Sequence, residues 1–313
     1  MVIREVIFKE LIKNGYSKSN GKKIWDIANR SLLNLTPEQA KAFLKLKNFK
    51  PYKKNVFDRE VKLIKDNIGK FIEKIGTNKQ FNLIDIGCGD GTKAKEFIRA
   101  LRNKVKIRYC PISPDEYLIN VAINNIKKGK FKNTIEYKPY KADFESLDKV
   151  ASLIRSKKFQ KNVILLHGSI LASYEINDYL FKLSTDMLKG DYIIIGNGIR
   201  KGERLVNLDL YKNKIFGNLF SPLMKSLGFK KNEIEQDARF GEMRVEGFFK
   251  IKVYKKVIHK GKVIEFNKGD EIIVAILYKY YLEELENFFK MYFSEVNIVK
   301  DSEDEYILAL CKK

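Results

Sequence analysis

The stretch Asn82-Leu83-Ile84-Asp85-Ile86-Gly87-Cys88-Gly89-Asp90-Gly91-Thr92-Lys93 joins an apolar run to three alternating glycines. We expect a buried strand to end there and a helix to begin. Glycine lets the backbone turn sharply and approach a ligand where a Cβ atom would collide, and the free N–H groups at the helix start would face that ligand. Asp85 precedes the first glycine, and a carboxylate repels phosphate but accepts from an ammonium group. The loop therefore predicts an S-adenosylmethionine site, with an ordinary strand-to-helix turn as the alternative.

The composition is that of a globular chain. It has 313 residues, of which 44% are hydrophobic and 32% are charged, a balance typical of folded proteins. No apolar run approaches the roughly 18 residues of a membrane span, and the N-terminus lacks an apolar segment with a small-residue cleavage site. Cys88, Cys110 and Cys311 are too few and too scattered for a disulfide framework or a metal site. We therefore expect a cytoplasmic protein without a bound metal.

The formal net charge of +22 is the main sign of a polyanionic partner, because clustered Lys and Arg gain counterion-release free energy on nucleic acid. Here the basic residues are dispersed beside Ile and Asn along the whole chain. This distribution indicates a compositional bias rather than one basic groove. Nucleic acid is therefore kept as the alternative partner, behind a small molecule.

Residues 1–75 are expected to form helices, the N-terminal part of a substrate lobe. Thr36 is expected to cap a helix that begins at Pro37, with Gln39 bonding back to the cap. Apolar residues recur at helical spacing along this segment. They are Val6, Leu11, Ile12, Ile24, Trp25, Ile27, Ala28, Phe57, Val61, Leu63 and Ile64.

From residue 81 short apolar strands alternate with amphipathic helices, which predicts a parallel sheet covered on both faces. The carboxyl ends of such strands line one edge, and ligands bind there at the switch point of the strand order. Residues 76–200 would thus form the cofactor-binding core. The expected strands are 81–86, 105–110, 134–139, 162–167 and 190–196, with helices near 92–103, 114–128, 145–156 and 175–188.

Residues 201–280 interrupt this alternation and predict an inserted α+β part of the substrate lobe. A helix is expected over about 205–228, followed by strands from Met243 to Ile258, Lys262 to Phe266 and Asp270 to Tyr280.

Residues 281–313 then return to the core, with a helix at 282–291 and strands at 295–299 and 305–311. The turn between these two strands is so short that they must be antiparallel. The predicted fold is α/β, a Rossmann-like and mostly parallel sheet with an antiparallel last strand and a second α+β lobe. This arrangement is typical of class I methyltransferases, which the chain resembles.

The candidate cofactor residues follow from this arrangement. The end of the second strand and the residues after it, from Arg108 to Pro114, lack the usual ribose-binding acid. Asp115 or Glu116 could substitute from the first helical turn, although either is equally well explained as a helix N-terminal charge. After the third strand, Asp143 and Phe144 form the expected adenine site, with a helix cap as the alternative for Asp143. The complete predicted cofactor set is Asp85, Gly87, Cys88, Gly89, Lys93, Ser113, Asp143, Phe144, Gly168 and Ser169.

After the fourth strand, His167-Gly168-Ser169 lie where a methyl group would be delivered. His167 could act as a general base, but a single His at a strand end is more often structural. We therefore assign no catalytic residue. His259 falls at an expected hairpin turn and receives no role.

The whole chain resembles the histidine N-alpha-methyltransferase family of the ergothioneine pathway. The resemblance is carried by Tyr16 with Gly21, Ile24, Trp25 and Asp26, by Phe49-Lys50-Pro51, by Arg59-Glu60, by Lys93 and by Asp143-Phe144-Glu145. It implies S-adenosylmethionine as methyl donor and S-adenosylhomocysteine as product. It also implies a lobe of N-terminal helices and a late insertion that selects the acceptor.

The substrate positions of that family are replaced in this chain. Ser173 stands for an asparagine that holds the amino acid backbone, Phe49 for a tyrosine, and Gly247 for a methionine after Glu246. Ala275 and Leu277 stand where the family grips the imidazole. Because a polar site discriminates through such hydrogen bonds, free histidine is an unexpected substrate, and Tyr16, Phe49, Ser173 and Tyr278 are the pocket candidates.

The expected function is methyl transfer from S-adenosylmethionine, most simply to a nitrogen of a small molecule other than free histidine. Two alternatives stay open: a methyltransferase that acts on RNA or protein, which the basic charge favours, and a non-catalytic cofactor-binding protein, which the missing ribose acid and the replaced pocket residues favour.

Overall fold

The computed structural model describes residues 3–29, 32–33, 36–102, 104–144, 147–202, 208–241 and 243–313. It divides into two compact units, each made of two chain segments. The core unit comprises Lys50–Arg204 and Lys279–Lys313, and the small unit comprises Met1–Phe49 and Leu205–Tyr278. We describe each by itself.

The core unit is built on a sheet with the strand order β14-β15-β8-β7-β3-β4-β5, and β6 pairs with β4. Neighbouring strands from β8 to β5 are parallel, whereas β15 is antiparallel to both β8 and β14. This confirms the predicted class I methyltransferase sheet. The strands are β3 (Phe81–Ile86), β4 (Ile107–Ser113), β5 (Thr134–Tyr137), β6 (Tyr140–Lys141), β7 (Lys161–Leu166), β8 (Tyr192–Gly198), β14 (Glu295–Lys300) and β15 (Tyr306–Lys312).

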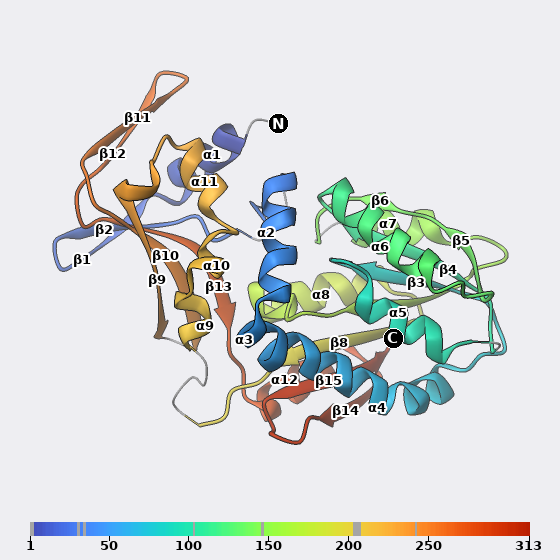
Figure 1. The fold of residues 1–313 in the computed structure, drawn as a ribbon. Helices are drawn as coiled ribbons and strands as arrows, with labels where there is room; N and C mark the ends of the chain where they lie inside the picture. The colour runs from blue at the N-terminus through green and yellow to red at the C-terminus, as the bar shows by residue number, and fades with distance from the viewer. Residues whose placement is uncertain are drawn as a thin grey trace. The chain divides into compact units, whose positions relative to one another are not determined.

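Helices cover both faces of this sheet. One apolar face of α4 (Asp58–Ile75) packs with α5 (Thr92–Ala100), with Ile126 of α6 (Glu116–Lys128) and with sheet residues such as Leu83 and Leu308 in one core cluster. In Figure 1, α4 runs in blue beside β15. A second group packs together elsewhere on the sheet: α7 (Leu147–Ile154), α8 (Ile176–Asp186) and α12 (Leu282–Tyr292). Short helical turns are α3 (Lys50–Tyr52), a π-helix at Lys53–Phe57 and a 3-10 turn at Leu171–Ser173.

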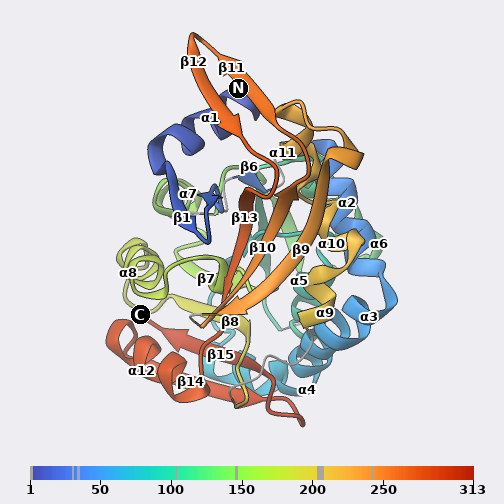
Figure 2. The ribbon, with the colours of Figure 1, turned by 90° about the vertical axis from the view of Figure 1, so that its left-hand side faces the viewer.

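The small unit contains a sheet of order β1-β2-β13-β10-β9 and a separate β11-β12 hairpin. Figure 2 shows β13, β10 and β9 side by side. Its strands are β1 (Tyr16–Ser19), β2 (Lys22–Asp26), β9 (Ile234–Gly241), β10 (Arg244–Ile251), β11 (Lys255–His259), β12 (Lys262–Phe266) and β13 (Glu271–Tyr278). Its helices are α1 (Ile3–Asn14), α2 (Pro37–Asn48), α9 (Leu208–Lys212), α10 (Lys214–Gly217) and α11 (Ser221–Ser226), with a 3-10 turn at Lys231–Glu233.

The N-terminal segment is not all helical, so the prediction for Ile24, Trp25 and the residues around them was wrong. Asn20 and Gly21 both have positive φ, at 50° and 75°, and form the turn between β1 and β2. Asn-Gly is the strongest short hairpin signal. β2 then pairs in parallel with β13, so that Trp25 lies opposite Ile272.

The predicted helix cap at Thr36 is confirmed, because its Oγ1 accepts from the Gln39 amide at 3.3 Å. The Gln39 side chain does not bond back to the cap. It is buried and donates instead to the carbonyl oxygens of Leu32 at 2.8 Å and Leu219 at 3.2 Å. It therefore joins the two chain segments of the small unit.

Three other expectations differ from the structure. The single helix expected over 205–228 is three short helices within its described part, because Asn213 caps α10 and Pro222 starts a new turn in α11. The strand expected from Met243 to Ile258 is broken after Ile251 into β10 and β11. The lobe boundary expected at 75 lies at Phe49, because α4 buries its apolar face in the core unit.

No described helix has the length and apolar character needed to cross a membrane.

Candidate functional site

The glycine loop follows β3 and has the geometry that its sequence predicts. Gly87, Gly89 and Gly91 have φ values of 65°, 54° and 73°, a region that disfavours side chains. A Cβ on Gly87 would lie 2.4 Å from Ile170 Cδ1 and 3.0 Å from Phe144 Cε1. A Cβ on Gly91 would lie 3.0 Å from the Ala122 carbonyl oxygen in α6. The loop thus needs glycine both for its conformation and for its close contacts.

Asp85 is the buried carboxylate at the end of β3. It is 4% exposed, and its Oδ2 accepts from the Tyr109 hydroxyl at 2.7 Å. Burial raises the pKa of Asp85 to about 6, against the opposing effects of the Tyr109 hydrogen bond and the nearby charges of His167 and Lys93. A cation bound here would lower the cost of keeping this carboxylate ionised.

The end of β4 has no free ribose-binding acid in the usual position. Asp115 caps α6, since its Oδ1 accepts from the Leu118 amide at 3.2 Å. The Asp115 amide in turn donates to the hydroxyl of the buried Ser113 at 3.2 Å. Glu116 is exposed in the first turn of α6. The structure therefore shows the helix-cap alternative for Asp115.

Phe144 is buried and packs its ring beside Gly87, and its carbonyl oxygen accepts from the Tyr179 hydroxyl at 2.9 Å. Asp143 is exposed. α7 is described from Leu147, and the two residues before it lie outside the described part, so the helix-cap alternative for Asp143 stays open. Glu145 of the same motif lies outside the described residues.

A buried cluster that the sequence did not predict surrounds Glu60. Glu60 is fully buried at the start of α4 and is ion-paired with Lys93 of α5. Its Oε1 lies 3.1 Å from His167 Nδ1 and accepts from the Gly168 amide at 3.0 Å. Burial alone would raise the pKa of Glu60, but the Lys93 charge and the His167 hydrogen bond outweigh it and lower the pKa to about 2. Glu60 is therefore ionised, and it ties α4 to the loop after β7.

This loop after β7 has an unusual backbone. Gly168 and Ser169 have φ values of 75° and 55°, and the Ser169 hydroxyl accepts from the Gly198 amide at 3.3 Å. Gly196 lies beside it in β8, and a Cβ there would be 2.1 Å from Glu60 Oε1. The glycine therefore makes the space that the Glu60 carboxylate occupies.

The four acceptor candidates fall in both units. Ser173 is partly buried at the end of its 3-10 turn in the core unit. Within the small unit, Tyr16 packs on Trp25 with ring centroids 4.9 Å apart, Phe49 ends α2, and Tyr278 pairs across the sheet with Arg244. The structure thus places three candidates on separate elements of one unit.

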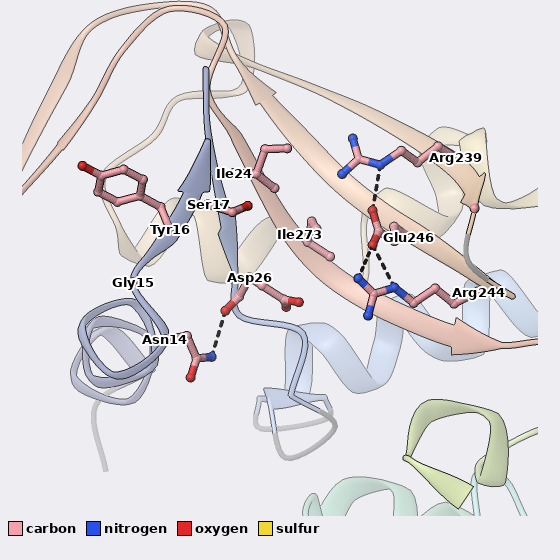
Figure 3. A pocket seen from close by; sticks show the side chains of 11 residues that line it. Asn14, Gly15, Tyr16, Ser17, Ile24, Asp26, Arg239, Arg244, Glu246 and Ile273 are labelled. Atoms are coloured by element: carbon pink, nitrogen blue, oxygen red, sulfur yellow. Dashed lines mark hydrogen bonds and ion pairs between the residues drawn. The ribbon is translucent and has the colours of Figure 1, made fainter. Parts of the chain in front are cut away.

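A cavity of about 460 Å³ lies within the small unit (Figure 3). In it Glu246 stands between two arginines: Oε2 is 2.7 Å from Arg239 Nε, and Oε1 is 2.9 Å from Arg244 Nε. Asp26 lines the same cavity, and burial raises its pKa. The remaining lining includes Asn14, Gly15, Tyr16, Ser17, Ile24, Gly241 and Ile273.

Comparison with known proteins decides the family. A family model described as histidine-specific methyltransferase, SAM-dependent, matches residues 41–313. The chain belongs to this family. S-adenosylmethionine is therefore the cofactor of this methyltransferase. No curated protein matches the chain.

Solved structures similar to the methyltransferase include a S-adenosylmethionine-dependent methyltransferase from Clostridium acetobutylicum. It is 16% identical with a TM-score of 0.46, over 87% of this chain and 98% of that one. An O-methyltransferase family 2 protein from Planctomyces limnophilus, in complex with apigenin, is 14% identical with a TM-score of 0.43, over 89% of this chain and 62% of that one.

The residues around the glycine loop of the methyltransferase fit its cofactor. The Asp85 carboxylate has a hydroxyl partner rather than a salt bridge among the described residues, so it is able to accept from an ammonium group. At the start of α5 the Thr92 amide donates to Asp90 Oδ1 at 3.2 Å, so a carboxylate of the loop itself satisfies one of the backbone N–H groups there. The three cysteines, including Cys88 in the loop, are free and buried. No described set of three or more His, Cys, Asp or Glu side chains is arranged to hold a metal ion.

Ala275 and Leu277, the positions that the resemblance assigns to the family's imidazole site, carry no hydrogen-bonding side chain in this methyltransferase. Gly247 pairs with Ala275, and Val245 pairs with Leu277, on neighbouring strands β10 and β13. Paired residues share one face of a sheet and successive residues alternate. This set therefore lies on the face opposite to Arg244, Glu246 and Tyr278, and opposite to the charged part of the cavity.

Proposed function

We propose that this methyltransferase transfers the methyl group of S-adenosylmethionine to a nitrogen of a small-molecule acceptor other than free histidine. One observation carries the acceptor part of the proposal. Ala275 and Leu277, which the resemblance places at the family's imidazole positions, and Gly247, which stands for its methionine, offer neither charge nor a side-chain hydrogen bond. A site that lacks these groups leaves a polar imidazole without hydrogen-bond partners, which costs about 1–3 kcal/mol of binding free energy for each buried polar group left unpaired.

The cofactor would be held at the glycine loop. Asp85 would accept from the ammonium group of the cofactor's methionine end. The backbone of Gly87, Cys88 and Gly89 would lie along the carboxylate of that methionine end. Lys93 is already paired with Glu60, so its contribution would be to the local charge rather than to a separate ion pair. The other proposed contacts come from Ser113, Asp143, Phe144, Gly168 and Ser169.

Methyl transfer depends mainly on how the acceptor nitrogen is positioned against the methyl group. A bound sulfonium supplies an activated methyl group with a good leaving group, so holding the acceptor nitrogen in line provides much of the acceleration. Within the small unit, Tyr16, Phe49 and Tyr278 would contribute to acceptor selection, and Ser173 would contribute from the core unit.

The test is transfer of a tritiated methyl group from S-adenosylmethionine into a cell extract of the source, fractionated into small molecules, RNA and protein. We expect label in the small-molecule fraction and none in added free histidine. Label confined to RNA, with binding that weakens steeply with salt, would instead establish a nucleic acid methyltransferase. Efficient labelling of histidine would contradict the acceptor assignment.

A binding test addresses the cofactor residues separately. Calorimetry should show binding of S-adenosylmethionine and S-adenosylhomocysteine to the full chain. Asp85→Asn keeps the shape of the side chain and removes its charge, so we expect at least about 10-fold weaker binding, and Asp85→Ala should weaken it further while the chain stays folded. Unchanged affinity in both variants would show that the site has been misplaced.

A further inference from the structure

His167 occupies the switch point of the core sheet. It directly follows Leu166 of β7, which pairs with Ile86 on one side and Ile195 on the other. It therefore lies at the carboxyl edge between the ends of β3 and β8. The strand order reverses at β3, since β4 and β5 continue to one side and β7 and β8 to the other. Ligands of open parallel sheets bind at this point.

The imidazole of His167 is held by a charged partner. Nδ1 lies 3.1 Å from Oε1 of Glu60, which is itself fully buried. Since Glu60 is an ionised acceptor, Nδ1 must carry the ring proton. In the neutral ring the lone pair is then on Nε2, away from Glu60.

The surroundings of the pair show that this arrangement is built rather than accidental. The same carboxylate accepts from the Gly168 amide at 3.0 and 3.2 Å, which fixes the loop that carries the histidine. Gly196 lacks the Cβ that would fill the carboxylate's position. A histidine with one ring nitrogen fixed by a carboxylate is the arrangement by which enzymes orient a general base.

We propose that His167 is the proton acceptor of the methyl transfer and that Glu60 is the residue that positions it. The inference rests on the proposed function, because it requires the methyl acceptor to be a nitrogen. An acceptor ammonium gives its proton to Nε2, and the freed lone pair attacks the methyl carbon. The carbon–sulfur bond breaks with its electron pair passing to sulfur. The products are the methylated ammonium, S-adenosylhomocysteine and an imidazolium that then returns its proton to water.

The charges around the imidazole bear on this role. Glu60 and Asp85 are the acidic groups that interact with His167, and Lys93 is the nearby cation. Burial and the charge of Glu60 raise the pKa of Tyr306, which keeps this hydroxyl neutral. Glu60 contacts the imidazole directly and is therefore the group that fixes the ring.

The decisive experiment measures label transfer into the small-molecule fraction at pH 7 and at pH 9.5. We expect His167→Gln to lose roughly 100-fold or more at pH 7, the range of general base catalysis. At pH 9.5 the solvent deprotonates the acceptor amine. The loss of activity in His167→Gln relative to the wild type should therefore be smaller than at pH 7 by about 10-fold or more. A purely structural histidine would give the same loss at both values and would overturn the proposal.

The proposed function and the histidine role fail in different ways. If the wild type labels no fraction, the proposed function fails and the base role fails with it. If the wild type labels small molecules and His167→Gln does so equally, only the base role fails.

A spectroscopic arm needs no acceptor. The chain has two histidines, so His259→Gln assigns the imidazole resonances of His167, and nitrogen-15 shifts report the tautomer. We expect the proton on Nδ1 in the wild type and its redistribution toward Nε2 in Glu60→Gln. A proton on Nε2 in the wild type would exclude the proposed pairing even if Glu60→Gln fails to fold.

Discussion

Each unit contains a glutamate whose carboxylate accepts from several cationic side chains or N–H groups, but the two glutamates differ in exposure. Glu60 in the core unit is fully buried and binds Lys93, His167 and the Gly168 amide. The Glu246 side chain in the small unit is 11% exposed and binds Arg239 and Arg244, whose side chains are 38% and 26% exposed.

The difference shows what each carboxylate is able to do. A buried charge is tolerated only when its partners satisfy it, and removal of one member leaves the others unpaired. Exposed partners are hydrated again at little cost. Glu60 therefore fixes a backbone loop, whereas Glu246 organises two side chains at the wall of a cavity.

Truncation of the two glutamates should give the largest contrast. We expect Glu60→Ala to lower the free energy of unfolding by about 3–5 kcal/mol, because the buried His167, the Gly168 amide and the partly buried Lys93 all lose their shared acceptor. Glu246→Ala should cost about 1–2 kcal/mol, since the arginines regain water. Urea denaturation followed by circular dichroism measures both. Equal losses would remove the distinction between the two sites.

The pH dependence of stability should come next in size. The folded pKa of Glu60, about 2, lies below the ordinary glutamate value of 4.5, so its stabilisation is complete above about pH 4.5 and is lost as the pH falls toward 2. At 1.36 kcal/mol per pH unit this amounts to about 3 kcal/mol. Glu60→Gln should remove this slope, and Glu246→Gln should leave the part due to Glu60 in place.

Asp85 supplies an opposite slope as an internal control for that titration. Its folded pKa of about 6 lies above the ordinary aspartate value of 3.8. The folded state therefore loses stability as the pH rises from 3.8 to about 6. Asp85→Asn should therefore flatten the curve between about pH 4 and 6. A wild-type curve without opposing slopes in these two windows would contradict the assigned burial of both groups.

A matched pair of glycine substitutions tests the space around the two sites. The added methyl of Gly196→Ala would lie 2.1 Å from Glu60 Oε1, whereas that of Gly247→Ala would lie 3.2 Å from Phe216 Cε1 and 3.4 Å from Ala275 Cβ. We expect Gly196→Ala to cost about 1–3 kcal/mol of stability through overpacking, and Gly247→Ala to cost less than about 1 kcal/mol. Thermal unfolding of both variants would reveal a reversed order.

Salt should produce the smallest effect. Screening acts on exposed charges and hardly on buried ones, so raising sodium chloride from 0.05 to 0.5 M should weaken the Arg239 pairing by a few tenths of a kcal/mol. The coupling between Glu60 and Lys93 should stay unchanged. Double-mutant cycles at the two salt concentrations measure each coupling energy.

Much of the fold could be predicted from local pattern. The apolar strands β3, β4 and β7 are each followed by an amphipathic helix, and the short turn before β15 requires an antiparallel ending. The glycine loop was predicted for the same reason, since its conformation depends on residues adjacent in sequence. The β1-β2 hairpin was missed because the helical spacing of the apolar residues predicted a helix, whereas the Asn20-Gly21 turn favours a hairpin.

The site beyond the loop could not be predicted from local pattern. Glu60 and His167 are 107 residues apart, and only the packing of α4 on the core unit brings them together. The resemblance of Arg59-Glu60 to a family motif was the available signal, but it gave no partner. Asp115 shows the converse case, in which a local helix cap was read as a possible ligand contact.

The parallel pairing of β2 with β13 also decides when this protein is able to fold. The Lys23 amide donates to Asp270, which comes 247 residues later, and synthesis of that interval takes about 12–50 s at 5–20 residues per second. The core sheet waits as well, because β15, which lies between β14 and β8, follows the whole inserted segment of the small unit in the chain. Each unit therefore exposes the apolar edges of an unfinished sheet until its second chain segment has been synthesised.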